Sequence, residues 1–307
     1  MLRFLCLSIL TLFVFCTAQA QTRHAASYIA RGNDYYTKGE LDLAISDFDI
    51  AVTLDPTFAG AYYNRAIARQ TKEDIVGALA DLDQAIQLNT RFAAAYVNRS
   101  ILHYLRGELD GAISDSTKAI ALDSRISEAY NNRGLARHDK GDFDGAIADF
   151  DHALKLKPRN DGGRRRSEVY NNRGVARYSK GDMDGAIQDH TSAIKLAARF
   201  FEAYADRGVA RQKKGEMDGA LADFTKAIEI NPRAAGAYYN RAAAWMALGN
   251  LQKSAADYTK ALEINPAYAE AHYSRALVRR DLGDLEGAVA DYRQAVALNP
   301  HLAEAGK

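Results

Sequence analysis

Cysteine, proline and surplus charge are all scarce in this sequence, and the shortages exclude several classes of protein. The two cysteines, Cys6 and Cys16, both lie close to the start, so the rest of the chain has neither a disulfide framework nor a cysteine-based metal site. The 40 Lys and Arg residues nearly balance the 39 Asp and Glu residues, which leaves a net charge of +1. A nearly neutral chain lacks the basic surplus that general nucleic-acid binders direct at phosphates.

An apolar run occurs at the start of the chain. Arg3 precedes the run from Phe4 to Phe15, and the segment from Ala18 to Ala20 follows it as a small-x-small cleavage pattern. We predict a secretory signal over residues 1–20 and a short linker over residues 21–24. The run is shorter than the roughly 20 apolar residues that cross a bilayer, so retention as an anchor is the weaker alternative. We expect an exported chain, periplasmic or secreted, with no stable membrane span after cleavage.

The rest of the sequence repeats one unit. An arginine recurs every 34 residues with one longer gap of 40, at Arg31, Arg65, Arg99, Arg133, Arg173, Arg207, Arg241 and Arg275. An aspartate follows each arginine at one fixed offset, at Asp47, Asp81, Asp115, Asp149, Asp189, Asp223, Asp257 and Asp291. The five prolines all occupy one place near the end of a unit, at Pro56, Pro158, Pro232, Pro266 and Pro300. The chain therefore contains eight copies of one unit.

These copies set the predicted boundaries. The eight repeats are 25–58, 59–92, 93–126, 127–160, 167–200, 201–234, 235–268 and 269–302. Residues 161–166 form an insertion, and residues 303–307 form a C-terminal tail. The insertion ends in the three arginines from Arg164 to Arg166, after two glycines. We expect a solvated insertion there, or alternatively a flexible basic loop that binds an anionic partner.

Each repeat has the periodicity of two helices, as the fourth repeat illustrates. Tyr130 and Gly134 lie four residues apart within a stretch that predicts a helix over about residues 128–140. Gly141 breaks this helix, and a second apolar pattern predicts another over about residues 144–156. Small residues on the first helix are expected to face alanines of the second, which would let the two backbones approach closely.

The 34-residue helix-turn-helix pattern resembles the tetratricopeptide repeat family, and the resemblance covers residues 25–302. It implies an all-α, right-handed superhelical solenoid of eight helix-turn-helix repeats with a concave groove. Two departures stand out. Arginine takes the place of the usual leucine in every repeat, and a second arginine often replaces a later aromatic residue, at Arg69, Arg137, Arg177, Arg211 and Arg279.

The eight arginines and their eight aspartates are interpreted as structural ion pairs within or between neighbouring repeats. A partly buried guanidinium needs a carboxylate to offset its desolvation, and a planar fork can bind one with two hydrogen bonds. The alternative is a basic stripe that grips acidic peptides.

An asparagine stands immediately before the arginine in five repeats, at Asn64, Asn98, Asn132, Asn172 and Asn240. The resemblance places this position on the concave lining, where an amide can donate to and accept from an extended peptide backbone. Tyrosines accompany the row, at Tyr63, Tyr239 and Tyr273. We expect these residues to bind peptide. The alternative is that the asparagines bridge adjacent helices or face water.

A clamp for acidic chaperone tails, known from some family members, does not fit. Asn33 and Asn64 match its asparagines, but Ile29, Ala94 and Asn98 stand where its basic residues would be needed. Catalytic motifs are missing as well, because no H-E-x-x-H, phosphate loop or G-x-S-x-G sequence occurs.

We therefore predict a non-catalytic scaffold that uses no metal or cofactor and binds an extended peptide or protein segment in its groove. Its partner is expected to be a protein, not a nucleic acid. The alternative is a structural component of an envelope or secreted assembly that docks through its convex face or its C-terminal edge.

Overall fold

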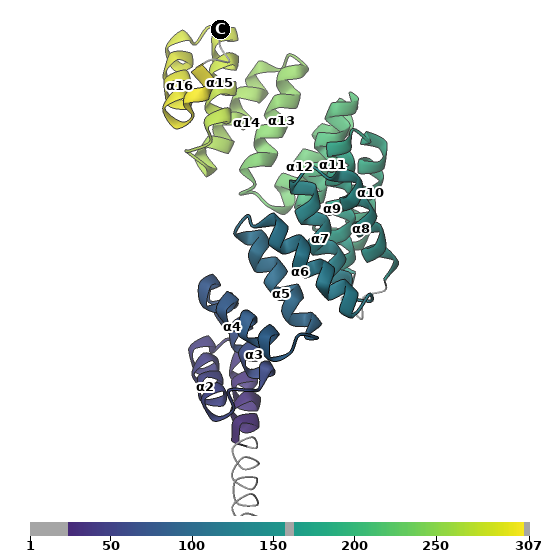
Figure 1. The fold of residues 1–307 in the computed structure, drawn as a ribbon. Helices are drawn as coiled ribbons and strands as arrows, with labels where there is room; N and C mark the ends of the chain where they lie inside the picture. Colours follow the sequence, from purple (N-terminus) through teal and green to yellow (C-terminus); the bar gives the residue numbers. More distant parts are fainter. Residues whose placement is uncertain (1–23, 157–162, 304–307) are drawn as a thin grey trace, which may run out of the picture. The chain divides into compact units, whose positions relative to one another are not determined.

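The computed structural model describes residues 24–156 and 163–303, and it is helical throughout (Figure 1). Residues 24–37 form the first helix. The remaining elements are α2 (Leu41–Leu54), α3 (Ala59–Thr71), α4 (Ile75–Leu88), α5 (Ala93–Leu105), α6 (Leu109–Leu122), α7 (Ser127–Asp139), α8 (Phe143–Lys155), α9 (Arg164–Lys180), α10 (Met183–Leu196), α11 (Phe201–Lys214), α12 (Met217–Ile230), α13 (Ala235–Ala247), α14 (Leu251–Ile264), α15 (Ala269–Asp281), α16 (Leu285–Leu298) and the 3-10 helix η1 (Pro300–Ala303). The predicted signal at 1–20 lies outside the described residues.

The chain divides between Asp142 and Phe143 into two units. In the first unit, α3 packs on α2 and α4, α5 packs on α4 and α6, and α7 contacts both α5 and α6. In the second unit, consecutive helices from α8 to α16 pack on one another in order, and the odd-numbered helices also contact the next odd-numbered helix. The predicted all-α architecture of sequential antiparallel helix pairs is confirmed. We call the two helices of each repeat its first and second helix.

The turn inside a repeat requires a left-handed backbone. Seven glycines provide it with φ between 73° and 90°, at Gly39, Gly107, Gly141, Gly181, Gly215, Gly249 and Gly283. In the second repeat Glu73 takes this conformation at φ 63°. A residue with a Cβ is less stable there by about 1 kcal/mol, so this turn is the weakest of the series.

Gly32 and Gly208 of the first helices lie against rings, which differs from the expectation that they face alanines. A Cβ added to Gly32 would come within 2.6 Å of the Phe48 ring, and one added to Gly208 would come equally close to the Phe224 ring. These rings are almost completely buried. The glycine therefore provides space for a large side chain, and the two helices interlock by matching volumes.

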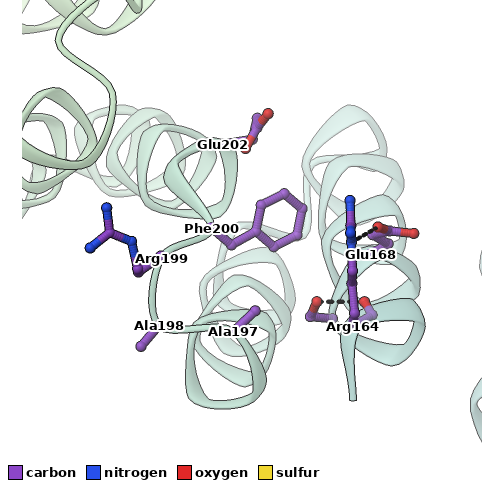
Figure 2. A pocket seen from close by; sticks show the side chains of 8 residues that line it. Arg164, Glu168, Ala197, Ala198, Arg199, Phe200 and Glu202 are labelled. Atoms are coloured by element: carbon purple, nitrogen blue, oxygen red, sulfur yellow. Dashed lines mark hydrogen bonds and ion pairs between the residues drawn. The ribbon is translucent and has the colours of Figure 1, made fainter. Parts of the chain in front are cut away.

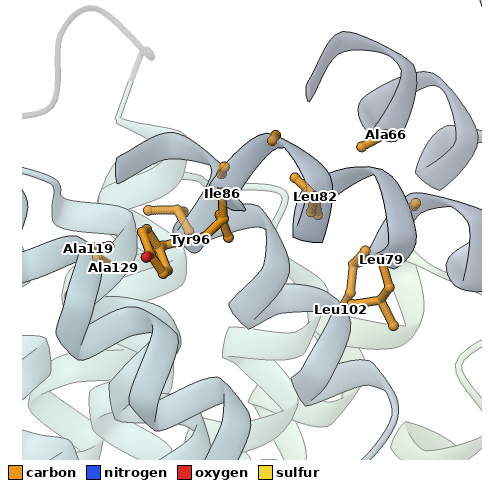
Figure 3. Packing of buried hydrophobic residues seen from close by; sticks show 12 residues of the cluster. Ala66, Leu79, Leu82, Ile86, Tyr96, Leu102, Ala119 and Ala129 are labelled. Carbon is orange, nitrogen blue, oxygen red and sulfur yellow. The ribbon is translucent and has the colours of Figure 1, made fainter. Parts of the chain in front are cut away.

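The core of the first unit continues this packing from one repeat to the next. Leu82 and Leu102 are fully buried, and Ile86 and Tyr96 lie in the same cluster, so α4 and α5 share one apolar interior (Figure 3). No helical pair could bury this surface alone, because each first helix covers the second helix that precedes it.

The repeated arginines and aspartates are in direct contact. In seven repeats, both Nε and Nη2 of the arginine donate to the aspartate sixteen residues later, at 2.5 to 2.9 Å. Arg133 lies in the first unit and Asp149 in the second, so their pairing remains a prediction. In the first seven repeats, the guanidinium of the repeated arginine also lies over a tyrosine ring, at 5.0 to 5.7 Å from the ring centre.

The remaining guanidinium nitrogen joins neighbouring repeats. Nη1 of Arg65 donates to Asp49 of the preceding repeat at 2.7 Å, and Nη1 of Arg207 donates to Thr191 at 3.0 Å. The same contact recurs from the second repeat to the eighth, always to an aspartate or a threonine. Six of the arginines thus link three helices each, namely Arg65, Arg99, Arg173, Arg207, Arg241 and Arg275.

Several aspartates hold a second arginine. Arg69 donates from Nη1 to Asp81 at 2.7 Å, although Asp81 already accepts two bonds from Arg65. Arg177, Arg211 and Arg279 make the same contact in their repeats. The Asp81 side chain is only 4% exposed, so two cations surround a carboxylate that has lost its water.

His190 is the polar exception among the core rings. It is 1% exposed and lies against Gly174, where other repeats place phenylalanine. Its Nδ1 donates to Asn171 Oδ1 at 2.8 Å, and Asn171 Nδ2 donates to Asp206 Oδ2 at 2.9 Å. Burial lowers the pKa of His190 to about 4. The imidazole is therefore neutral in the folded protein at physiological pH.

The two carboxylates that hold Arg65 differ in burial, and this difference provides a test. We expect Asp81→Ala to lower the free energy of unfolding by about 3–5 kcal/mol, because it leaves two arginines without their buried partner. Asp49→Ala, which removes a partner that is 51% exposed, should cost under about 1 kcal/mol. Urea unfolding followed by circular dichroism measures both. Equal losses in the two variants would contradict the assigned roles.

His190 should make stability depend on pH. The unfolded imidazole titrates near pH 6.5 and the folded one near pH 4, so the unfolded state binds more protons between these values and stability falls as the pH decreases through this window. The loss reaches about 3 kcal/mol at pH 4. His190→Phe should remove this component from unfolding curves measured at pH 4 to 7. An unchanged pH slope in the variant would show that His190 titrates normally.

Candidate functional site

The first helices of neighbouring repeats share one polar and aromatic surface in each unit, which we call the first-helix face. It comprises the side chains through which one first helix touches the next. In the first unit, Tyr36 Oη and Thr71 Oγ1 lie 3.2 Å apart, and Tyr104 Oη donates to Asp139 at 2.7 Å. In the second unit, the bond from Asn171 to Asp206 connects α9 with α11. The face is therefore continuous along each unit.

Three of the predicted asparagines bridge neighbouring first helices. Asn64 Nδ2 donates to Asn33 Oδ1 at 3.1 Å, and Asn98 Nδ2 donates to Tyr63 Oη at 2.8 Å. Asn132 Nδ2 donates to Ser100 Oγ at 3.2 Å. All three are half-buried. Nδ2 of Asn98 also donates to Ala94 O, and Nδ2 of Asn132 also donates to Val97 O, so in these two amides the acceptor oxygen is the group left for a ligand. These residues hold the stack together and keep hydrogen-bonding capacity for a ligand.

The other two asparagines lie in the second unit. Asn172 on α9 is half-buried beside the buried Asn171, and it has interactions of its own. Asn240 on α13 is also half-buried, but its side chain makes no hydrogen bond to any residue in the described part of the chain. Asn240 is therefore the asparagine of the row with the most unused hydrogen-bonding capacity.

The predicted tyrosines lie on the same face, and each packs against a ring of its own repeat. The Tyr63 ring lies 4.8 Å from the Phe92 ring, and burial raises the pKa of Tyr63. The Tyr239 ring lies 5.0 Å from that of Tyr268. Tyr273 on α15 lies 6.3 Å from Tyr292. Each ring is half-buried at its own position, so it presents an edge or hydroxyl to the face.

The arginines point away from this face. In the seven repeats described above, Nε and Nη2 bind the aspartate of the second helix, and in six of these Nη1 binds the preceding second helix. The hydrogen bonds to Asp115 raise the pKa of Arg99 further above its ordinary value. These guanidinium groups have little capacity for a ligand, because their donors already have acceptors.

Four positions of this face lack positive charge in every repeat. Four positions of each first helix lie on one side because of helical spacing. Counted from the repeated arginine, they are the fifth, second and first residues before it and the second residue after it. None of the eight repeats has lysine or arginine at any of these places. The acidic residues there are Glu128, Glu168, Glu202, Asp206 and Glu270. Burial raises the pKa of Asp206, and the nearby charge of Glu202 acts in the same direction.

A cavity of about 570 Å³ opens beside this face, at the start of α9 and α11. Figure 2 shows the Phe200 ring directed toward the helix that carries Arg164 and Glu168. Arg164 Nε lies 3.4 Å from Glu168 Oε1, so the two charges offset each other, and Arg199 and Glu202 complete the charged part of the lining. This balanced lining favours neither an anion nor a cation.

The three arginines of the insertion are helical, so the alternative of a flexible basic loop is wrong at these residues. Arg164–Arg166 form the first turn of α9, which has 17 residues where the other first helices from α3 onward have 13 or 14. Gly163 precedes them in a left-handed conformation at φ 84°. The arginine run continues a helix because nothing in it breaks one.

Metal-binding clusters and membrane-spanning helices are both absent from the described residues. No group of three or more His, Cys, Asp and Glu side chains in this part of the chain is arranged to hold a metal ion. Within the same residues, no helix combines the length and apolar character that crossing a bilayer requires.

One polar connection was missed at the sequence level. Asn171, His190 and Asp206 each differ from the residue type of most other repeats, and the structure joins them in one chain of hydrogen bonds. The signal available in the sequence was that three unusual polar residues occur together in adjacent repeats.

Comparison with known proteins agrees with this architecture. The family model "Tetratricopeptide repeat" matches residues 127–160, 201–233, 235–268 and 269–302, and "TPR repeat" matches residues 32–73. Together these matches cover more than half of the chain. No curated protein matches the sequence.

Solved structures include similar folds. A tetratricopeptide repeat protein from Parabacteroides merdae has a TM-score of 0.65 at 19% identity, over 83% of this chain and 99% of that one. Cut9–Hcn1 of the APC/C has a TM-score of 0.65 at 15% identity, over 89% of this chain and 52% of that one. YrrB, described as having an unusual peptide-binding site, has a TM-score of 0.48 at 26% identity, over 62% and 95%. Repeats of this kind mediate protein–protein interactions and form scaffolds that are generally non-catalytic. The chain belongs to the tetratricopeptide repeat family.

Proposed function

We propose that this protein is a non-catalytic scaffold that binds an extended peptide or protein segment along the first-helix face. The observation that carries the proposal is the row of half-buried amides and tyrosines on neighbouring first helices within each unit, with Asn64 and Tyr63 in the first unit and Asn240 and Tyr273 in the second. An amide matches both groups of a peptide backbone, and tyrosine is a frequent anchor at interfaces.

The arrangement of partners supports this use. Asn98 Nδ2 donates to Tyr63 Oη and to Ala94 O at 3.1 Å, while the acceptor oxygen of the same amide has no partner in the described residues. The Asn240 side chain makes no hydrogen bond to any of the described residues. Such groups are half-buried and already ordered by helix packing, so a bound backbone would gain hydrogen bonds with little loss of side-chain entropy.

The charge of the face restricts the ligand. An acidic peptide would meet Glu202 and Asp206 in the second unit without any lysine or arginine at the neighbouring face positions. Like charges at short range oppose binding. We therefore propose a neutral or basic segment as the ligand, in contrast to the acidic tails bound by the carboxylate clamp of some relatives.

Export is part of the same proposal. The predicted signal at residues 1–20 and the absence of cysteine after Cys16 suit a periplasmic or secreted protein. A protein partner would then be met in the periplasm or outside the cell.

A comparison of alanine variants at Asn240 and Asn98 distinguishes a residue that binds the ligand from one that bridges helices. Peptides of about ten residues would be selected from a displayed library on the full chain. We expect Asn240→Ala to weaken the best of them about tenfold, since a lost hydrogen bond in a desolvated contact is worth about 1–2 kcal/mol, without moving the unfolding midpoint. Asn98→Ala should lower the midpoint because it removes the bridge to Tyr63.

The matched control is Lys260→Ala, an exposed change on the second helix α14, which should alter neither quantity greatly. Binding that survives Asn240→Ala and Tyr239→Ala but fails after Lys260→Ala would place the ligand on the second helices and reject the proposal.

The signal has its own test. Expression of the full chain in a bacterium with an outer membrane should give an exported product that begins at Gln21, as read by N-terminal sequencing. A cytoplasmic product that still begins at Met1 would refute export.

A further inference from the structure

The second helix of the eighth repeat presents an exposed apolar row. Leu285, Val289 and Tyr292 of α16 are 64%, 49% and 36% exposed, and they lie on one side of the helix at spacings of four and three residues. The short helix η1 contacts α16 but leaves this row open. Single exposed apolar residues are normal on a protein surface, whereas three large ones on one side of a helix form a patch that indicates an interaction site.

The same row is covered in the preceding repeats. Phe224 and Tyr258, which correspond to Tyr292, are 0% and 1% exposed, and Leu221, which corresponds to Val289, is 9% exposed. The cover is the first helix of the following repeat, because α13 packs on α12 and α15 packs on α14. The row on α16 therefore has the shape that receives a helix.

The charge of the residue beside this row determines which charge a helix that docks on α16 must carry. Each first helix from the second repeat onward donates its arginine Nη1 to an aspartate or a threonine of the preceding second helix, such as Thr259 under Arg275 at 3.0 Å. The corresponding residue of α16 is Arg293, and it is exposed. An incoming helix with an arginine there would bring two guanidinium groups together, whereas a carboxylate would form an ion pair.

A second position sets the direction of the helix. A lysine seven residues after the repeated arginine pairs with an acidic residue of the preceding second helix, as Lys214 does with Asp184 at 2.7 Å. Lys72, Lys140 and Lys180 repeat this contact. The corresponding acidic residue of α16 is Glu286. A basic residue seven places after the carboxylate would therefore meet Glu286.

We propose that α16 is a docking site for an amphipathic helix of a partner protein, which carries an acidic residue opposite Arg293 and a lysine or arginine seven residues later opposite Glu286. The apolar row of Leu285, Val289 and Tyr292 provides the contact area. A second copy of this chain is a poor occupant, because its first helix carries Arg31, whose side chain is 54% exposed, at the place that would face Arg293.

The test uses two peptides that span residues 199–216 of this chain, which include α11, the first helix of the sixth repeat. One peptide carries Arg207→Glu and the other keeps arginine, while both keep Lys214. Each is closed by the same lactam on its outer side so that their helicity is equal. Fluorescence anisotropy measures their binding to the full chain and to three variants of it: Arg293→Glu, Val289→Asp and Leu43→Asp.

The glutamate peptide should bind the unaltered chain about tenfold more tightly than the arginine peptide, and Arg293→Glu should reverse this preference. Val289→Asp should abolish binding of both. Leu43→Asp is the matched control, because Leu43 and Val289 are both 49% exposed, and it should change nothing.

Three results would overturn the proposal. They are equal affinity of the two peptides, binding that is insensitive to Val289→Asp, and no binding of either peptide at millimolar concentration. Self-association of the unaltered chain in sedimentation experiments, if lost in Val289→Asp, would also overturn it, because the occupant would then be a second copy.

Discussion

The buried pair between an arginine of the first helix and an aspartate of the second is the contact on which the rest of the stack depends. Removing a carboxylate from water is unfavourable unless charge and hydrogen bonds replace the water. Here both oxygens of Asp223 accept from Arg207, and Arg211 adds a third bond. Because Nη1 of the same arginine reaches the preceding repeat, a shift of one helix by a turn would break bonds to two other helices at once. The ion pairs thereby define the register as well as the packing.

This use of arginine explains the character of the first-helix face. The guanidinium groups turn toward the second helices, so the face keeps amides, tyrosines and a few carboxylates, and it has no lysine or arginine at the positions compared. A stripe that looks basic in the sequence is therefore neutral to acidic where a ligand would lie. Asn64 and Asn98 have a structural role beside the proposed binding role, since their bridges align the helices that carry the other amides.

The sequence predicted the helices, the repeats and the arginine–aspartate contacts because all of these depend on spacing that is the same in every repeat. It did not predict what varies between repeats. The chain from His190 through Asn171 to Asp206 uses three residues that each occur at a different place in the repeat, and only their contact reveals the connection. The helical start of α9 was missed because two glycines before Arg164 indicate a loop, while the arginines themselves favour a helix. The partner of Gly32 was missed because spacing cannot distinguish a ring from an alanine on the facing helix.

The same regularity makes the exceptions informative at the eighth repeat. Where every earlier contact pairs an arginine with an aspartate or a threonine, α16 offers Arg293, so the rule that stacks one repeat on the next opposes the addition of another repeat of the same kind. The apolar row remains suited to a helix, since Tyr292 occupies the place of the buried Tyr258. A surface that keeps the shape of the internal contact and reverses its charge selects a different helix from the one the chain itself carries. The first-helix face and α16 are therefore separate surfaces with separate requirements, one for an extended backbone and one for a helix, and a single partner could satisfy both only if it contained a segment of each kind.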